Sequence, residues 1–213
     1  SFSRHLRKCF APSGKLRWAK VFHGDAASLP VKFEICSGIG DWVLAQAQAD
    51  AGTANWIACE LRFDRVSSIF TKMALAAVNN LALLAGDAAM ICSHHIAAAS
   101  VQWVCINFPE PAQTSRNVSG EGAENQLHLL TKEFFDAIAL LLSADGHLTL
   151  FSDNELYMHT LAKAVAAAGF VSQAESCHGW RFRKVWVCSG QPGPLQGHAA
   201  AQESYFDRFF QHG

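Results

Sequence analysis

Short, continuously apolar runs alternate with longer amphipathic stretches along most of this chain. The apolar runs lack the polar–apolar alternation of a half-exposed strand, which predicts strands buried on both faces of a parallel sheet. The stretches between them space their apolar residues at helical intervals. The predicted strands are Lys32–Cys36, Asn55–Glu60, Leu81–Ala85, Val101–Asn107 and His147–Ser152, and the predicted helices are Asp41–Ala49, Arg65–Asn79, Ala88–Ile96, Thr131–Leu142 and Glu155–Ala168.

Two further strand-like runs, Val171–Gln173 and Arg181–Cys188, follow the last predicted helix. Because no full helix separates them, we predict that they pair antiparallel at one edge. Strand–helix alternation implies right-handed crossovers between the other strands. The predicted fold is therefore α/β, a doubly wound, mostly parallel seven-stranded sheet with an antiparallel edge strand. It forms one domain over residues 31–213, preceded by a basic N-terminal segment at residues 1–30.

Composition excludes two classes of protein. Half of the 213 residues are hydrophobic and the formal net charge is −1, which excludes general disorder and a bulk polycation. The charge is unevenly distributed, however, since the first 24 residues contain six basic side chains and no acidic one. These basic residues are either a solvated face or phosphate contacts. They are Arg4, Arg7, Lys8, Lys15, Arg17 and Lys20, with a second cluster at Arg181, Arg183 and Lys184.

The seven cysteines include no C-x-x-C pair, and most lie inside apolar runs. This pattern favours buried free thiols and a reducing compartment. No run of 18 apolar residues occurs, so we expect no membrane span. The sequence contains no secretory signal, which favours an intracellular, cytoplasmic location and leaves a nuclear or organellar one open. The ten histidines lack metal-ligand spacing, so we predict no metal site.

A glycine-containing turn, Cys36-Ser37-Gly38-Ile39-Gly40, joins the first predicted strand to the first helix. At the carboxyl edge of a parallel sheet, such a turn lets a ligand approach the backbone closely, although a plain tight turn is the simpler alternative. Glu60 ends the second strand 20 residues after Gly40, a spacing that suits a carboxylate accepting both hydroxyls of a ribose. Asp87, after the third strand, either contacts an adenine amino group or caps a helix.

The charge around this turn distinguishes two classes of ligand. Asp41 follows Gly40 directly, and a negative charge at that helix start disfavours the pyrophosphate of a dinucleotide. S-adenosylmethionine instead carries a sulfonium and an ammonium, which Glu34 and Asp41 would attract. We therefore predict S-adenosylmethionine as the cofactor.

An acidic turn between two prolines, Pro109-Glu110-Pro111, follows the fourth predicted strand. The carboxyl edge of the sheet is where an α/β enzyme holds its second substrate. A carboxylate there matches the N1–H and N2–H₂ donors of guanine and leaves N7 free to react. The alternative is a rigid loop exit in which Glu110 is merely solvated.

The order of these motifs resembles that of the tRNA (guanine-N7-)-methyltransferase family, which has the Rossmann-like class I methyltransferase fold. In the first part of the chain, the family's opening Trp and Phe are similar to Trp18 and Phe22, and its E-I-G-x-G-x-G motif is similar to Glu34–Gly40. The family's G-I-E strand end is similar to Ala58–Glu60, and the Arg-rich helix start that follows is similar to Leu61–Val66. In the second part, the F-P-D-P motif is similar to Phe108–Pro111, the T-D-x-x-x-Y motif to Ser152–Tyr157, and the closing T-x-Y-E-x-R-F…G to Ser204–Gly213.

The resemblance implies methyl transfer to guanine N7 of tRNA or a related RNA, with a protein partner subunit as a further possibility. N7 carries no proton, so its lone pair can attack the methyl group without a general base, and catalysis rests on proximity. The implied catalytic residues are Glu110 and Asp153, the cofactor-binding residues are Glu34, Gly38, Gly40, Glu60 and Asp87, and the substrate-binding residues are Arg116, Ser204 and Asp207.

The chain departs from the family pattern at several of these positions. Cys36 replaces the first glycine of the turn, and Glu110 replaces the Asp of F-P-D-P. The basic run that follows that motif in the family is replaced by Ala112–Asn117, in which Arg116 is the one basic residue. These departures motivate a second hypothesis, a catalytically inactive methyltransferase fold that serves as an RNA- or protein-binding subunit.

Overall fold

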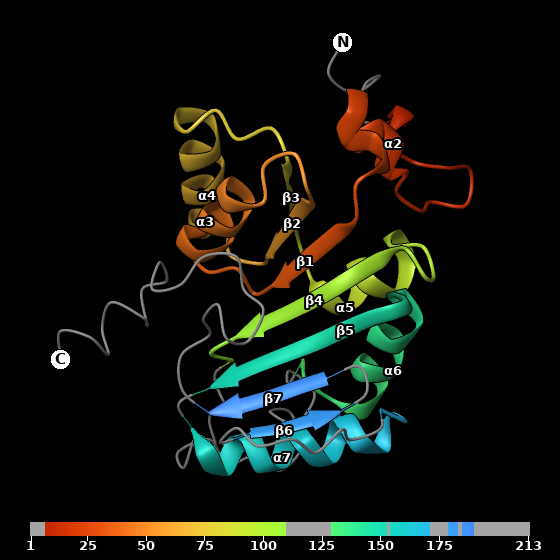
Figure 1. Cartoon of the computed structure of the whole chain (residues 1–213), viewed down its shortest axis with the longest axis vertical. Helices are drawn as coiled ribbons and strands as arrows, with labels where there is room; N and C mark the ends of the chain where they lie inside the picture. Colours follow the sequence, from red (N-terminus) through yellow and green to blue (C-terminus); the bar gives the residue numbers. More distant parts are fainter. Residues whose placement is uncertain (1–6, 110–128, 153, 171–178, 183–184, 190–213) are drawn as a thin grey trace, which may run out of the picture.

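One seven-stranded sheet runs through the part of the chain that the computed structural model describes, residues 7–109, 129–152, 154–170, 179–182 and 185–189 (Figure 1). The strand order is β3-β2-β1-β4-β5-β7-β6, and the described pairs are parallel except β6 with β7. This confirms the predicted doubly wound, mostly parallel sheet with an antiparallel edge strand. The strands are β1 (Val31–Ile35), β2 (Asn55–Glu60), β3 (Leu81–Ala85), β4 (Val101–Asn107), β5 (Leu142–Ser152), β6 (Gly179–Phe182) and β7 (Val185–Ser189).

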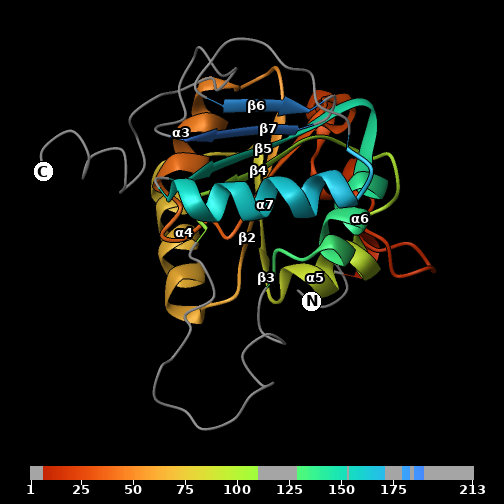
Figure 2. The same ribbon diagram turned by 90° about the horizontal axis from the view of Figure 1, so that it is seen from below.

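Helices cover both faces of this sheet. Helices α3 and α4 pack together on one face, whereas α6 packs against both η2 and α7 on the other. Figure 2 shows α5, α6 and α7 together on one side of β4, β5 and β7. The helical segments are α2 (Trp18–Val21), η1 (Gly24–Ser28), α3 (Asp41–Ala49), α4 (Phe63–Leu75), α5 (Ala88–Met90), η2 (Ile91–His95), α6 (Lys132–Leu141) and α7 (Glu155–Ala167).

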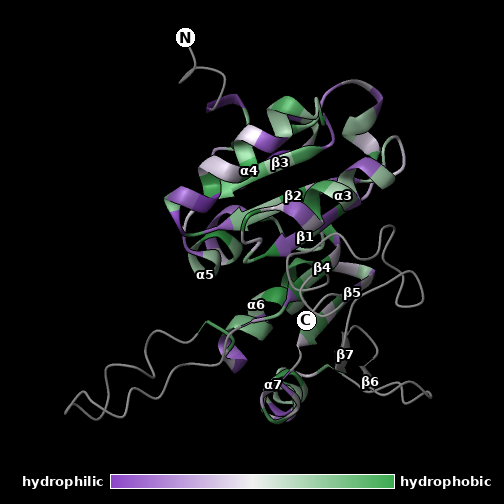
Figure 3. Cartoon of the chain, turned by 90° about the vertical axis from the view of Figure 1, so that its left-hand side faces the viewer, coloured by the Kyte–Doolittle hydropathy of each residue, from purple (hydrophilic) through white to green (hydrophobic). Residues whose placement is uncertain are grey.

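Strand β1 places its apolar side chains on one face of the sheet and its two charged side chains on the other. Val31, Phe33 and Ile35 belong to the cluster that α6 and α7 help to form. Because successive strand residues point to opposite faces, Lys32 and Glu34 face the α3 side. Figure 3 shows β2 as largely hydrophobic, whereas β1, α3 and α4 also carry hydrophilic segments. The strand therefore inserts two charged side chains into a buried layer.

Most predicted elements match the structure, and β2, β3 and β4 have the predicted bounds. Strand β5 begins at Leu142, earlier than the predicted His147, because the chain enters the sheet directly after α6. The register with β4 shifts between Val101 and Trp103 at this point. A Cβ at Gly146 would lie 3.1 Å from the Gln102 carbonyl oxygen, so the close approach there requires glycine.

Two predicted helices have different ends. Helix α4 runs from Phe63 to Leu75 instead of Arg65 to Asn79. It ends early because Ala77 adopts a φ of +52°, and the Asn80 amide then donates to the carbonyl oxygen of Ala54 at 2.9 Å, which directs the chain into β3. The predicted helix Ala88–Ile96 is a three-residue α-helix continued by a π-helical turn.

The predicted single strand Arg181–Cys188 is wrong. Two strands, β6 and β7, occupy this region and pair antiparallel, with Phe182 opposite Val185. Only two residues connect them, the length of a tight hairpin, and the basic pair Arg183-Lys184 separates two apolar runs at that point. The antiparallel pair thus lies within the second predicted run; the first, Val171–Gln173, lies outside the described residues.

Residues 16–22 pack against the amino end of the sheet. Leu16 and Phe22 are buried in the cluster that includes α6 and α7. The Leu16 amide donates to the His95 carbonyl oxygen at 2.7 Å, and Trp18 Nε1 donates to the Ser100 carbonyl oxygen at 3.2 Å, just before β4 begins. This anchor places residues 16–22 at the end of β4 opposite its carboxyl edge.

Candidate functional site

The candidate site lies where the carboxyl ends of β1 and β4 meet. The strand order reverses there, because β2 and β3 extend from one side of β1 while β4 and β5 extend from the other. Such a reversal opens a crevice for ligands at the carboxyl edge in doubly wound folds. Three polar side chains lie at this edge: Glu60 and Asn107 are the last residues of β2 and β4, and Glu34 is the last but one of β1.

The two glycines of the turn after β1, Gly38 and Gly40, have different structural roles. Gly40 has a φ of +83° and precedes α3 as its N-cap; a Cβ there would lie 2.6 Å from Cγ1 of Ile69 in α4. Glycine at position 40 is therefore required for the close approach of α3 and α4. Gly38 has a φ of +57° and open space around its Cα, and its amide donates to Glu60. Only Gly38 leaves the room that a ligand needs.

Cys36 adopts a backbone conformation that favours glycine. Its φ is +61°, in the left-handed region that strains residues with a Cβ. Its side chain is accessible to solvent. Surrounding protein atoms partly desolvate the sulfur, and the negative charges of Glu60 and Glu34 lie nearby. Both effects disfavour the thiolate and raise the pKa of the Cys36 thiol to about 12. The thiol is thus protonated at neutral pH and is a poor nucleophile.

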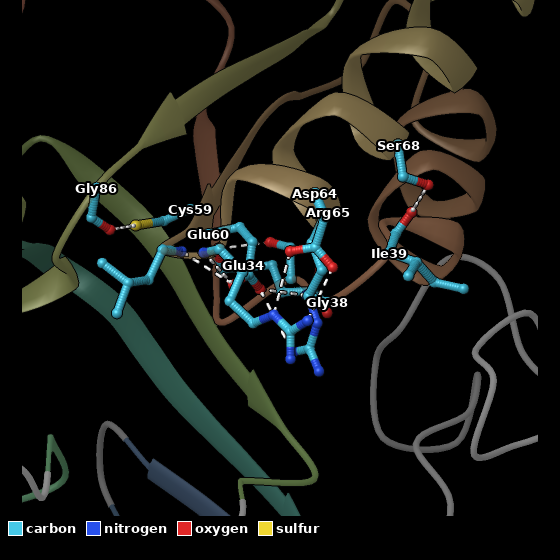
Figure 4. A network of polar contacts seen from close by, with 12 residues as sticks. Glu34, Gly38, Ile39, Cys59, Glu60, Asp64, Arg65, Ser68 and Gly86 are labelled. Atoms are coloured by element: carbon cyan, nitrogen blue, oxygen red, sulfur yellow. Dashed lines mark hydrogen bonds and ion pairs between the residues drawn. The ribbon is translucent and has the colours of Figure 1, made fainter.

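The Glu60 carboxylate holds the turns after β1 and β2 together. It is buried, and its Oε2 accepts the Gly38 amide at 2.9 Å while its Oε1 accepts the amides of Leu61 and Arg62, each at 2.9 Å. Arg65 Nη1 lies 4.0 Å from Oε2. Figure 4 shows Glu60 beside Glu34, Gly38 and Arg65. A carboxylate has about four lone-pair sites, so acceptor capacity remains for a ligand hydroxyl.

Glu34 and Asn107 leave two buried oxygen atoms without partners. Asn107 Nδ2 donates to Glu34 Oε1 at 2.8 Å. Glu34 Oε2 and Asn107 Oδ1 are buried and have no hydrogen-bond partner among the described residues. Burial raises the pKa of Glu34 to about 7; the Asn107 and Ser37 side chains oppose this increase, and the Glu60 charge adds to it. The site therefore presents buried acceptors that lack donors.

The other two predicted acidic residues already have structural partners. Asp87 Oδ1 accepts the Met90 amide at 2.8 Å and so caps α5, the alternative role considered from the sequence. Asp41 forms an ion pair with Lys72 of α4. Because Lys72 compensates its charge, Asp41 does not by itself disfavour phosphate, which corrects the argument from sequence.

The remaining predicted site residues lie outside the described residues: Glu110, Arg116, Asp153, Ser204 and Asp207. The structure does describe the ends of β4 and β5, the strands that precede Glu110 and Asp153 in the chain. Asn107 of β4 is in register with Phe151 of β5, and the Phe108 amide donates to the Phe151 carbonyl oxygen at 2.7 Å. Phe108 has a φ of +48°, a strained conformation of the kind found at functional sites.

Sequence reasoning missed Asn107. The available signal was a polar residue at the end of an otherwise apolar strand, directly before the Phe108–Pro111 motif. Its relation to Glu34 could not be read from the sequence, because the two residues are 73 positions apart.

Comparison with known proteins relates this geometry to a family. Residues 28–179 match the model of a family described as putative methyltransferase. The tRNA (guanine-N(7)-)-methyltransferase of Chlamydia trachomatis is 33% identical over 82% of this chain and 76% of its own length, and that of Chlamydia abortus is 37% identical over the same shares. The chain belongs to the tRNA (guanine-N7-)-methyltransferase family.

Solved structures agree on the fold. A SAM-dependent methyltransferase from Aquifex aeolicus has a TM-score of 0.50 at 11% identity, over 82% of this chain and 90% of the other. An aminoglycoside resistance methyltransferase has a TM-score of 0.51 at 17% identity, over 70% and 78%. This member of the tRNA (guanine-N7-)-methyltransferase family thus has the Rossmann-like methyltransferase fold.

The site of this methyltransferase fits S-adenosylmethionine, the cofactor of its family. That molecule has an ammonium and two ribose hydroxyls, all hydrogen-bond donors, and the edge offers Glu34, Asn107 and Glu60 as buried acceptors. Gly38 leaves space at the turn. Over the described ranges, no group of three or more His, Cys, Asp or Glu side chains could hold a metal ion, and no described helix is long and apolar enough to cross a membrane.

Proposed function

We propose that this protein transfers a methyl group from S-adenosylmethionine to N7 of a guanine in tRNA. The observation that carries the proposal is the pair of unpartnered acceptors, Glu34 Oε2 and Asn107 Oδ1, buried at the β1–β4 reversal of a methyltransferase-family chain. A buried acceptor without a donor costs about 1–3 kcal/mol of stability. A ligand that brings donors recovers that cost on binding.

The cofactor, when bound, supplies an electrophilic methyl group on a positively charged sulfur. In the proposal, Glu60 Oε2 accepts one ribose hydroxyl with the lone pair that the amides of Gly38, Leu61 and Arg62 leave free. Glu34 attracts its ammonium. Asp87 is exposed, and its Oδ2 is proposed to accept the adenine amino group while Oδ1 keeps its capping bond to Met90. Gly40 contributes the fixed helix start and no direct contact.

Glu110 and Asp153 are proposed to orient the guanine. Carboxylates match its N1–H and N2–H₂ donors, and the chain leaves β4 and β5 for these two residues at one edge of the sheet, since Asn107 and Phe151 are in register. N7 has a lone pair and no proton, so no residue must remove one. The protein contributes proximity and alignment, worth up to about 7–11 kcal/mol in well-oriented reactions.

Residues 1–30 are proposed to be an RNA-contacting segment added to a methyltransferase domain at 31–213. Arg7, Lys8, Arg17 and Lys20 are exposed, whereas Lys15 Nζ already donates to the Ser93 carbonyl oxygen at 2.8 Å. Because residues 16–22 lie at the amino end of the sheet, these contacts would bind tRNA far from the reacting guanine. Arg116, Ser204 and Asp207 are proposed to bind tRNA close to the guanine. We place the reaction in the cytoplasm.

The alternative is an inactive methyltransferase fold that binds RNA or a protein partner. The strained Cys36 in the cofactor turn is the observation that favours it, because strain there opposes the geometry that cofactor binding needs.

One experiment separates the two functions. The purified chain is incubated with unmodified tRNA and methyl-labelled S-adenosylmethionine, and the digested RNA is analysed for 7-methylguanosine. We expect label in 7-methylguanosine for the wild type and its loss in Glu110→Ala, with Glu133→Ala on the exposed start of α6 as the matched control. Cofactor binding without methylation of any tRNA would favour the inactive subunit, and no cofactor binding would exclude the enzyme.

A further inference from the structure

Glu34 and Asn107 form one polar unit across two strands. Glu34 lies on β1 and Asn107 at the end of the neighbouring β4, and one amide hydrogen bond of 2.8 Å joins them. That bond uses one oxygen of the carboxylate and the nitrogen of the amide. The two atoms left over, Glu34 Oε2 and Asn107 Oδ1, are both acceptors and both buried. Each side chain therefore holds the other with one polar atom and has a second polar atom, a buried oxygen, without a donor.

The described cationic side chains on this face contact other acidic residues, not Glu34. Lys32, two residues before Glu34, pairs with Asp50 at 2.7 Å. Lys72 pairs with Asp41 and also donates to the Ile39 carbonyl oxygen at 2.9 Å. Arg65 lies beside Glu60. Within the described ranges, no cation satisfies the two oxygens, so their donor must come from outside these elements.

A primary ammonium matches this pair best. It carries three N–H donors on one atom, so it can donate to both oxygens at once. A hydroxyl has one donor and would leave one oxygen unsatisfied. A positive charge also compensates the buried carboxylate, whose desolvation is the largest obstacle to its ionisation. The methyl donor and its product both end in an amino-acid group that contains such an ammonium.

We propose that Asn107 is a positioning residue for the amino-acid end of the cofactor: it fixes the Glu34 carboxyl group through Nδ2 and adds its own Oδ1 as the second acceptor for the ammonium. This inference rests on the proposed function. In this role Asn107 recognises the charged amino-acid end of S-adenosylmethionine and makes no contact with its nucleoside.

The charge state of Glu34 gives this arrangement a signature in pH. The groups that act on it are Asn107 and Ser37, which favour the ionised form, and Glu60, which opposes it; Cys36 and Cys105 stay protonated at neutral pH because their pKa values are raised. With a pKa of about 7, Glu34 ionises near neutral pH in the free protein. A ligand ammonium should bind more tightly as the pH rises through this range.

The test compares two ligands that differ in the amino-acid end. S-adenosylhomocysteine carries the ammonium, and 5′-methylthioadenosine has the nucleoside and sulfur without it. Calorimetric titration of both is done with the wild type, with Asn107→Leu, which keeps the volume and removes the polar atoms, and with Asn79→Leu on the exposed turn before β3 as control.

We expect Asn107→Leu to weaken S-adenosylhomocysteine by about 10- to 100-fold, the loss of one or two hydrogen bonds to a charged group. 5′-Methylthioadenosine should lose less than about 3-fold, since additivity holds for independent contacts. Equal losses for both ligands, or no loss for either, would overturn the role of Asn107 while leaving the proposed function intact. A wild type that binds neither ligand would overturn both.

A second measurement does not depend on the folding of the variant. Wild-type affinity for S-adenosylhomocysteine should increase between pH 6 and pH 8, and the affinity for 5′-methylthioadenosine should stay constant over the same range. A common pH dependence for the two ligands contradicts the proposal.

Discussion

Strand β1 places two charged side chains on the same face, and their surroundings differ completely. Lys32, near the amino end, contacts Asp50 at 2.7 Å, and Asp50 Oδ2 also accepts Trp56 Nε1 at 2.8 Å. The Lys32 ammonium lies over the rings of Trp56 and Trp103, 5.5 and 5.1 Å from their centroids. Glu34, near the carboxyl end, forms no ion pair with a described residue, and its Oε2 has no hydrogen-bond partner there.

The difference distinguishes a charge that the fold compensates from one that the described residues leave uncompensated. The Lys32–Asp50 pair is mostly buried and its charges are matched within the fold, so it specifies how α3 packs on the sheet. Glu34 is more deeply buried and has no opposite charge beside it among the described residues, which costs stability in the free protein. A protein keeps such a cost where a ligand later supplies the missing charge.

The largest effect should come from Asp50→Leu. Removal of one partner of a buried ion pair leaves Lys32 buried and uncompensated, and Trp56 Nε1 loses its acceptor. We expect a loss of about 3–5 kcal/mol in the free energy of unfolding, measured by urea titration. Affinity for S-adenosylhomocysteine should be unchanged at temperatures where the variant is folded. A loss below about 1 kcal/mol would show that solvent reaches the pair and would remove the contrast.

Glu34→Gln should change stability in the opposite direction. The folded-state pKa of Glu34 is raised from 4.5 to about 7, so its ionisation destabilises the wild type progressively as the pH rises from about 4.5 to 7. Below that window the carboxyl group is neutral in both states and the penalty is absent. At pH 8 we expect Glu34→Gln to be more stable by up to about 3 kcal/mol, with the gain vanishing near pH 4.

This second variant also tests function. Glu34→Gln should lose affinity for S-adenosylhomocysteine while it gains stability, which is the expected signature of a binding residue. If urea titrations at pH 5 and pH 8 give parallel changes for wild type and variant, Glu34 is not the destabilising group described above.

Cys36→Gly sharpens the comparison at the turn beside Glu34. Glycine adopts the φ of +61° without strain, so it should stabilise the fold by about 0.5–1 kcal/mol, the strain released less the entropy that glycine adds to the unfolded chain. Cys36→Ala, which keeps a Cβ, is the matched control and should show no gain. The midpoint of thermal unfolding reports the difference, and equal midpoints for the two variants would contradict backbone strain.

The smallest effect is expected at an exposed ion pair. Lys132 and Asp136 lie one helical turn apart on α6, with side chains roughly half exposed, and their atoms are 2.7 Å apart. Because water and salt screen such a pair, Lys132→Ala should leave the urea midpoint unchanged within error. A loss comparable to that of Asp50→Leu would mean that burial does not explain the contrast along β1.

Periodic patterns in the sequence were sufficient to predict most of the strands and helices. The apolar runs of β2, β3 and β4 identified these strands to the residue. For the largely buried central strands β2 and β4 the reason is that a strand covered on both faces must be mostly apolar, whereas β3 is an apolar edge strand that is only partly buried. The glycine turn and Glu60 were likewise found from their spacing, and Glu60 indeed contacts Gly38. The antiparallel pair of β6 and β7 was missed, because only two residues, Arg183 and Lys184, separate the two strands in the sequence.

By itself the sequence determined the order of strands and helices, the sheet edge that carries the site and the family, since all of these follow from local pattern and motif order. Only the tertiary structure decided which charges are matched. Lys72 compensates Asp41, Asp50 compensates Lys32, and Asn107 holds Glu34 without neutralising it. These pairs join residues 18 to 73 positions apart, and the energy of a buried charge depends on neighbours that chain folding alone brings together.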